Sequence, residues 1–118
     1  MPIQIKTDLA CKQNHDLETG TNCLGPHLLT LLLEPILITT AASPNMPPGS
    51  VRIVWVVSLM TGANIPGGMN LDSKGEPVYC TPFMENYMQS KVGCAWLTDL
   101  YAKRLASKGI LSVVRLPL

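Results

Sequence analysis

Tyr87 and Lys91 are the residues of this 118-residue chain whose types and spacing could best support catalysis. They lie four positions apart, so a helix through them would place a phenol and an ammonium group on one face. The positive charge would favour the phenolate form and make the tyrosine a usable proton donor and acceptor. The same spacing also occurs by chance on helix surfaces, so the surrounding elements must decide its meaning.

Two helices are predicted around this pair. A leucine-rich segment that starts near residues 17–22 and ends at Ala42 predicts the first. The second carries Tyr87 and Lys91. Thr81 is suited to its N-cap, Pro82 to its first turn and Gly109 to the position just past its end.

A β-branched run at 51–57 predicts a buried strand, and the run at 110–115 predicts the next parallel strand. The resulting order of helix, strand, helix, strand indicates an α/β layer with parallel strands and right-handed crossovers. Residues 61–82 contain several glycines and prolines and predict a long loop between the first strand and the second helix.

Four motifs in one order resemble the second half of the catalytic domain of short-chain dehydrogenases/reductases. They are Thr-Asn-Cys-Leu-Gly-Pro at 21–26, the strand at 51–57 that runs into Ser58, Tyr-Met-Gln-Ser-Lys-Val-Gly at 87–93, and the segments 101–106 and 109–114. The order is similar in detail to the retinol-dehydrogenase-like members of filamentous fungi. The resemblance covers residues 12–117.

The resemblance implies a role for four residues. Tyr87 matches the general acid/base, and Lys91 matches the lysine that favours the phenolate and hydrogen bonds the nicotinamide ribose. Ser58 matches the hydroxyl that holds the substrate oxygen. Asn22 matches the residue that organises a water near the lysine. Taken alone, Ser58 could simply end a strand and Asn22 could be a helix cap.

The resemblance also implies a partial Rossmann-like, doubly wound fold with NADP or NAD as cofactor. The glycine-rich turn that holds the pyrophosphate in this family is not found. Residues 19–25 resemble this turn, but the spacing between their glycines differs from the family pattern by one residue, and Pro26 follows. We therefore expect residues 1–118 to form one truncated dinucleotide-binding domain that does not bind the cofactor on its own.

Two segments depart from the family pattern. Val57 stands where many members have the first serine of a pair, which leaves Ser58 to carry the role. Leu-Pro-Leu at 116–118 replaces the usual Asn-Pro-Gly. The absent glycine matters because that turn normally brings backbone close to the nicotinamide.

Two functions follow as alternatives. The first is an NAD(P)-dependent oxidoreductase that transfers hydride to or from a small lipophilic alcohol or carbonyl compound, in secondary metabolism. The second is a catalytically inactive remnant or a helix-mediated protein-interaction module. The chain is 47% hydrophobic and 14% charged. If half of the domain is absent, we expect exposed apolar surface and a homo-oligomer formed through the two long helices.

The remaining composition argues against other partners. A formal net charge of +1, scattered basic residues and few aromatics do not favour nucleic acid. The N-terminal residues lack the apolar core of a signal peptide. The most apolar stretch, 28–39, is short and contains Glu34 and Pro35, so we expect no membrane span and a cytoplasmic protein.

The four cysteines are Cys11, Cys23, Cys80 and Cys94. They show no metal-ligand spacing, and no paired histidine could complete a site. We expect no metal and interpret the cysteines as reduced thiols that act as small core residues.

Overall fold

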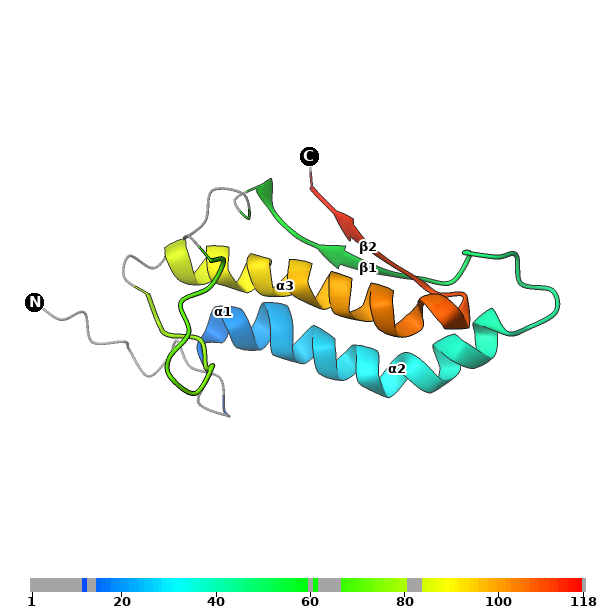
Figure 1. Ribbon diagram of the computed structural model, residues 1–118, viewed down its shortest axis with the longest axis horizontal. Helices are drawn as coiled ribbons and strands as arrows, with labels where there is room; N and C mark the ends of the chain where they lie inside the picture. The colour runs from blue at the N-terminus through cyan, green and yellow to red at the C-terminus, as the bar shows by residue number, and fades with distance from the viewer. Residues whose placement is uncertain (1–11, 13–14, 60, 62–66, 81–83, 118) are drawn as a thin grey trace, which may run out of the picture.

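Two long helical segments lie side by side, and a two-stranded sheet covers one of them (Figure 1). The computed structural model describes residues 12, 15–59, 61, 67–80 and 84–117. The elements are α1 (Leu17–Thr19), η2 (Gly20–Leu24), α2 (Gly25–Ala41), β1 (Arg52–Val56), α3 (Met84–Leu105), η4 (Ala106–Lys108) and β2 (Leu111–Arg115).

The first helical segment begins with a capped turn. The carboxylate of Asp16 accepts a hydrogen bond of 2.8 Å from the backbone N–H of Thr19. A single wide turn, η2, follows, in which the N–H of Gly25 donates to the carbonyl of Gly20. Residues 19–25, which imitate a phosphate-binding turn in sequence, are therefore helical. The predicted start of this helix, near residues 17–22, is confirmed. The wide turn is not predicted from the sequence.

β1 and β2 pair in parallel, with Val54 opposite Val113. Their inner face packs on α3 through Trp55, which stacks on Tyr101 at 5.6 Å between ring centroids. The indole N–H of Trp55 also donates to the hydroxyl of Ser112 at 3.1 Å.

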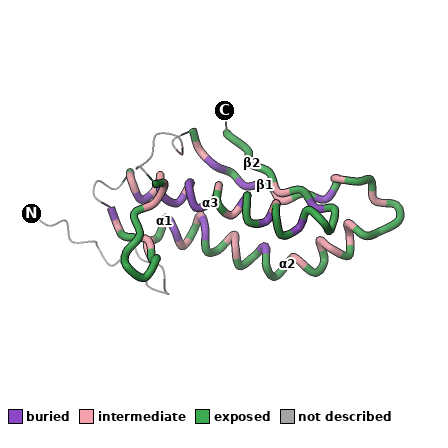
Figure 2. The backbone as a smooth tube through the Cα atoms, viewed as in Figure 1, coloured by how far each residue is buried: buried purple, intermediate pink, exposed green. Residues whose placement is uncertain are grey.

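Figure 2 shows that buried residues concentrate on α3, with a short buried stretch on β1 and none on β2. The predicted α/β order and the positions of both strands are confirmed. The prediction that the strand at 51–57 is buried is wrong for its outer face, where Val54 and Val56 are exposed because nothing among the described residues covers that side of the sheet.

The end of α3 follows the sequence signals. Leu105 closes the helix, and after the short η4 turn Gly109 adopts a left-handed conformation with φ of +76°. Asp99 and Lys103 lie four residues apart and form an i,i+4 ion pair at 2.6 Å. The predicted N-cap and first-turn residues, Thr81 and Pro82, lie outside the described residues.

The loop at 67–80 is held to α3 by two buried polar side chains. The carbonyl oxygen of Gln89 accepts a hydrogen bond from the N–H of Asn70 at 2.6 Å. Asn86 makes two bonds with the backbone of Cys80, at 2.7 and 2.8 Å. The described part of the predicted loop is therefore firmly attached to the helix that carries Tyr87 and Lys91.

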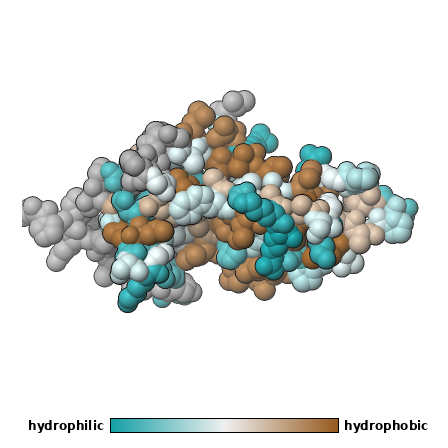
Figure 3. All heavy atoms as spheres, viewed as in Figure 1, coloured by the Kyte–Doolittle hydropathy of each residue, from teal (hydrophilic) through white to brown (hydrophobic). Residues whose placement is uncertain are grey.

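Apolar surface is exposed on two sides of the molecule. On the outer face of the sheet, Val54 and Val56 are each 52% exposed. On α2, Leu28, Leu32 and Ile36 are exposed, and Figure 3 shows hydrophobic side chains over α2 along the lower edge of the molecule. This agrees with the apolar composition, because neither surface has a covering layer among the described residues.

One helical stretch, Leu17–Ala41, is long and apolar enough to cross a membrane when judged by length and composition alone. It is longer than the 28–39 stretch considered from sequence because η2 and α1 continue α2 without a break. Core helices of soluble proteins meet the same criteria, so this finding does not establish a membrane span.

Candidate active site

Tyr87 and Lys91 lie on one face of α3, as their spacing predicts. The ammonium nitrogen of Lys91 is 5.7 Å from the centre of the Tyr87 ring, within the range of a cation–π contact. Both side chains are half-buried, so neither is sealed inside the core.

Lys91 also fixes this face of α3 against the sheet. Its Nζ donates a hydrogen bond of 3.0 Å to the carbonyl oxygen of Val56, the last residue of β1. Ser58 follows two residues later, so the predicted serine, tyrosine and lysine all lie around the carboxyl end of β1. Ligands of open α/β sheets bind at this edge. Figure 1 shows the ends of both strands over the N-terminal half of α3.

Asn22 reaches the same region from the other helical segment. Its side-chain amide donates to the hydroxyl of Ser90 at 2.9 Å and to the carboxylate of Glu18 at 3.1 Å. Ser90 in turn donates to the backbone carbonyl of Tyr87 at 2.7 Å. Asn22 is therefore linked to α3 between Tyr87 and Lys91. Its role in organising a water near the lysine stays a prediction.

Ser90 and Glu18 were not singled out from the sequence. Glu18 lies four residues before Asn22, so the i,i+4 spacing could have indicated that contact. Ser90 is 68 residues from Asn22, and no local pattern predicts their hydrogen bond.

Two buried cysteines join the helices next to this network. The thiol of Cys23 donates to the carbonyl of Ser90 at 2.9 Å, and the thiol of Cys94 donates to the carbonyl of Asn22 at 3.1 Å. Together with Cys80 they are buried and free of disulfides, as expected for core thiols. Sequence reasoning missed that two of them form a pair.

The two thiols differ in acidity. The Cys23 thiol, which could donate a hydrogen bond to a thiolate on Cys94, lowers the pKa of Cys94 to about 7. The charge of Lys91 lowers it further, while burial acts in the opposite direction. The pKa of Cys23 is raised, first by its hydrogen bond with Cys94 and then by burial. A thiolate in this pair is therefore favoured on Cys94.

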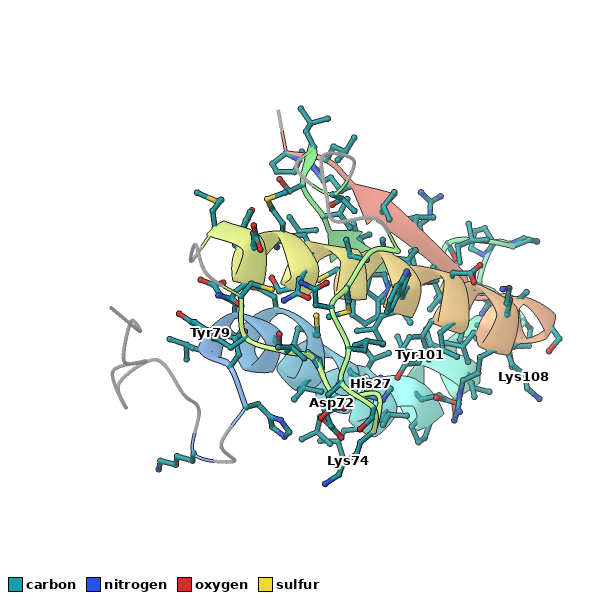
Figure 4. All side chains as sticks on the ribbon, turned by 60° about the vertical axis from the view of Figure 1, so that its left-hand side comes forward. His27, Asp72, Lys74, Tyr79, Tyr101 and Lys108 are labelled. Carbon is teal, nitrogen blue, oxygen red and sulfur yellow. The ribbon has the colours of Figure 1, made fainter. Side chains whose placement is uncertain are left out.

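A mostly apolar cavity of about 350 Å³ lies between α3, η2 and the start of α2. Cys23, His27, Gly93 and Trp96 are among its lining residues, but Ser58, Tyr87 and Lys91 are not. The imidazole of His27 is hydrogen bonded to the hydroxyl of Tyr101 at 3.0 Å, and Figure 4 shows the two side chains pointing toward one another. His27 is therefore packed against α3. The cavity and the predicted catalytic residues are separate features.

Within the described ranges, no group of three histidine, cysteine, aspartate or glutamate side chains could hold a metal ion. The arrangement around β1 instead offers a phenol, an ammonium group and a hydroxyl at one sheet edge.

Comparison with known proteins gives this arrangement a family context. The chain is 38% identical over 109 residues to a short-chain dehydrogenase/reductase of Phaeosphaeria nodorum, a match that covers 89% of this chain. It is 41% identical over 104 residues, or 85% of the chain, to a short-chain dehydrogenase/reductase of Neocamarosporium betae. A third relative, from Pestalotiopsis fici, is 35% identical over 107 residues, or 90% of the chain.

The chain is related to the short-chain dehydrogenase/reductase family. The predicted resemblance, including its fungal character, is thereby confirmed. The chain spans about a third of the length of these relatives: 33%, 29% and 32%, respectively. No family model matches the chain. No solved structure matches it either.

Proposed function

We propose that this chain carries the proton-transfer site of an NAD(P)-dependent oxidoreductase of the short-chain dehydrogenase/reductase family. The observation that carries the proposal is the hydrogen bond from Lys91 to the carbonyl of Val56. It holds the Tyr87–Lys91 face of α3 at the carboxyl end of β1, beside Ser58. Relationship to the fungal enzymes supports the same assignment.

Each residue has a distinct task in this proposal. Tyr87 donates a proton to the substrate oxygen, or accepts one from it, and Ser58 holds that oxygen by a hydrogen bond. The ammonium group of Lys91 lies beside the ring and favours the phenolate form between turnovers. Asn22, held by Ser90 and Glu18, supports the path by which the proton is replaced.

The donors around β1 are compatible with the ribose of a nicotinamide cofactor. Lys91 has three N–H donors, and the carbonyl of Val56 accepts one of them. The remaining donors and the Tyr87 hydroxyl would hold the ribose of NADP or NAD. When bound, the cofactor supplies or accepts the hydride. We propose no residues for the pyrophosphate.

The finer features of the proposal rest on the resemblance seen in the sequence. We propose a small lipophilic alcohol or carbonyl compound as the substrate, a role in fungal secondary metabolism and a cytoplasmic location. We also propose that the two parallel strands and their helices are part of a Rossmann-like, doubly wound domain.

The exposed face of α2 supports a further element, a homo-oligomer formed through the long helices. Leu32 is 70% exposed and Ile36 is 63% exposed, and both lie on a helix with no charged residue in its first or last turn. Covering such side chains would remove a large apolar surface from water.

The experiment is an activity screen of the protein that carries this sequence, with NADPH or NADH and a panel of lipophilic aldehydes and ketones. Oxidation of the nicotinamide is followed by absorbance. Tyr87→Phe keeps the ring and removes the hydroxyl, so turnover should fall by about 10²- to 10⁴-fold, the usual contribution of a general acid. Binding of the cofactor, measured by fluorescence, should change little.

Tyr79→Phe is the matched control, because it makes the same chemical change in the loop at 67–80. It should leave turnover unchanged. Full activity of Tyr87→Phe would refute the proton-transfer role. A folded wild-type protein that turned over no substrate with either cofactor would support the non-catalytic alternative.

A further inference from the structure

Cys23 and Cys94 form the one pair of described cysteines in mutual contact, and each also bonds the backbone of the opposite helix. Cys23 in η2 donates to the carbonyl of Ser90, and Cys94 in α3 donates to the carbonyl of Asn22. The two thiols belong to one buried cluster with Val57, and each influences the pKa of the other. Their exposed fractions are 7% and 3%.

We propose that Cys23 and Cys94 are an oxidation site, at which a peroxide converts the two thiols into a disulfide that joins η2 to α3. The proposal does not depend on the oxidoreductase activity proposed above. It rests on the contact between the two thiols, on the difference in their surroundings and on a route for a small oxidant.

The surroundings assign the two sulfur atoms different roles. The ammonium group of Lys91 and the thiol of Cys23 both stabilise a thiolate on Cys94. The pKa of Cys23 is raised, first by its interaction with Cys94 and then by burial, and these effects outweigh the lowering by Lys91, so Cys23 stays protonated. Cys94 is therefore the attacking sulfur, and Cys23 is the resolving thiol.

The chemistry balances with hydrogen peroxide as the oxidant. The Cys94 thiolate attacks one peroxide oxygen, the O–O bond breaks, and the departing hydroxide takes up a proton to become water. The sulfur of Cys23 then attacks the sulfenic acid formed on Cys94, so that the S–S bond forms and the S–O bond breaks. The second hydroxide leaves as water with the proton of Cys23. Two thiols thus give two electrons to one peroxide.

The cavity of about 350 Å³ supplies the route. Cys23 and Gly93 both line it. Gly93 leaves room for the sulfur, because a Cβ at this position would lie 2.6 Å from Cys23 Sγ. A molecule as small as hydrogen peroxide can therefore reach the Cys23 side of the pair through a cavity that is much larger than itself. Cys94 does not line the cavity but lies next to Cys23 in the same buried cluster.

Oxidation would change the hydrogen bonding beside the predicted catalytic residues. A disulfide has no S–H group, so the carbonyls of Ser90 and Asn22 would both lose their thiol donors. Ser90 directly precedes Lys91 in α3, and Asn22 of η2 bonds Ser90. The disulfide would thus couple the redox state of the pair to the backbone next to Lys91.

The test is peptide mapping of the full chain after exposure to hydrogen peroxide. The remaining thiols are blocked with iodoacetamide under denaturing conditions, and the protein is digested with trypsin. Lysine and arginine positions separate the four cysteines into the peptides 7–12, 13–52, 75–91 and 92–103. The expected product is a cross-link between peptides 13–52 and 92–103, which is lighter than the two reduced peptides by two hydrogens and is lost after treatment with dithiothreitol.

A variant with Cys11→Ser and Cys80→Ser retains only the proposed pair. It should lose both of its free thiols to peroxide without forming a covalent dimer. Oxidation after unfolding in urea is the control for the native contact, and it should give mixed cross-links in the wild-type chain. Cross-links that involve mainly Cys11 or Cys80, or a variant that keeps two free thiols in peroxide, would overturn the proposal.

Discussion

Replacing Gly93 with alanine would place a methyl group 2.6 Å from the sulfur of Cys23. Real Cβ atoms essentially never lie so close to another heavy atom, so one of the two groups must move. The sulfur is held by its hydrogen bond to the carbonyl of Ser90 at 2.9 Å, and Cys23 is only 7% exposed. The methyl group would therefore displace a buried and hydrogen-bonded thiol.

Two opposing contributions determine how much Gly93→Ala changes the free energy of unfolding. Overpacking a core costs about 1–3 kcal/mol, whereas alanine inside a helix gains about 1 kcal/mol over glycine. Gly93→Ala should therefore lower the free energy of unfolding of the wild-type chain by about 0–2 kcal/mol. The next nearest atoms, the Cβ of Cys23 and the Cε of Met69, are at 3.7 and 3.9 Å, which are ordinary contact distances.

Removing the sulfur should reverse the sign of this change. In a Cys23→Ala background the methyl group meets no close atom, so Gly93→Ala should raise the free energy of unfolding by up to about 1 kcal/mol through helix propensity alone. The difference between the two backgrounds is a coupling energy of about 1–3 kcal/mol.

The assay is urea unfolding of the four proteins in this cycle, followed by tryptophan fluorescence. Trp55 is 4% exposed in the folded chain, so its emission should report the loss of the core. The slope of free energy against urea concentration should be the same in all four. If Gly93→Ala had the same effect in both backgrounds to within about 0.5 kcal/mol, the close contact between Gly93 and Cys23 would be refuted.

Two other predictions concern acidity and assembly. Cys94 faces the thiol of Cys23 and the charge of Lys91, with Asp16 nearer to Cys23, and its pKa is lowered to about 7. Its thiolate fraction, and hence its rate of alkylation by iodoacetamide, should rise only about tenfold from pH 6 to pH 8, against about ninetyfold for a thiol with the ordinary pKa of 9.0. Leu32→Lys should shift any dimer toward monomer in sedimentation velocity, because it places a charge on the exposed face of α2.

Each of these two predictions has a control experiment that shows which result would contradict it. N-acetylcysteine, alkylated in the same series, gives the steep pH profile of a free thiol, and the same profile for the peptide 92–103 would contradict the lowered pKa of Cys94. Val54→Lys adds the same charge to the outer face of the sheet. If it dissociated the oligomer and Leu32→Lys did not, the interface would lie on the sheet rather than on α2.

The regular elements could be predicted because their signals are local. The β-branched run at 51–57 contains β1, and the run at 110–115 contains β2. Gly109 marks the end of the second helix because a left-handed residue is needed there, and glycine adopts that conformation without strain. Propensity and turn chemistry act over a few residues, so one sequence is enough to place these boundaries.

The wide turn of η2 could not be predicted in this way. The sequence of Gly20–Leu24 contains no signal for an i→i+5 bond, and an ordinary helical turn would suit it equally well. In the structure this segment carries Asn22 and Cys23, whose side chains bond Ser90 of α3. Contacts with a helix almost seventy residues away accompany the local geometry, and such contacts do not appear in a window of sequence.

The candidate site could also be predicted only in part, because some of its contacts are local in sequence and others join distant segments. The four-residue spacing placed Tyr87 and Lys91 on one face, but only the folded chain ties Lys91 to Val56 and Asn22 to Ser90. These two hydrogen bonds come from different elements and converge on a single turn of α3. A change in η2 can therefore alter the position of Lys91 without touching the strand, through Ser90. Because Cys23 and Cys94 bond the same segments, their oxidation to a disulfide would affect the position of Lys91 and therefore proton transfer at Tyr87.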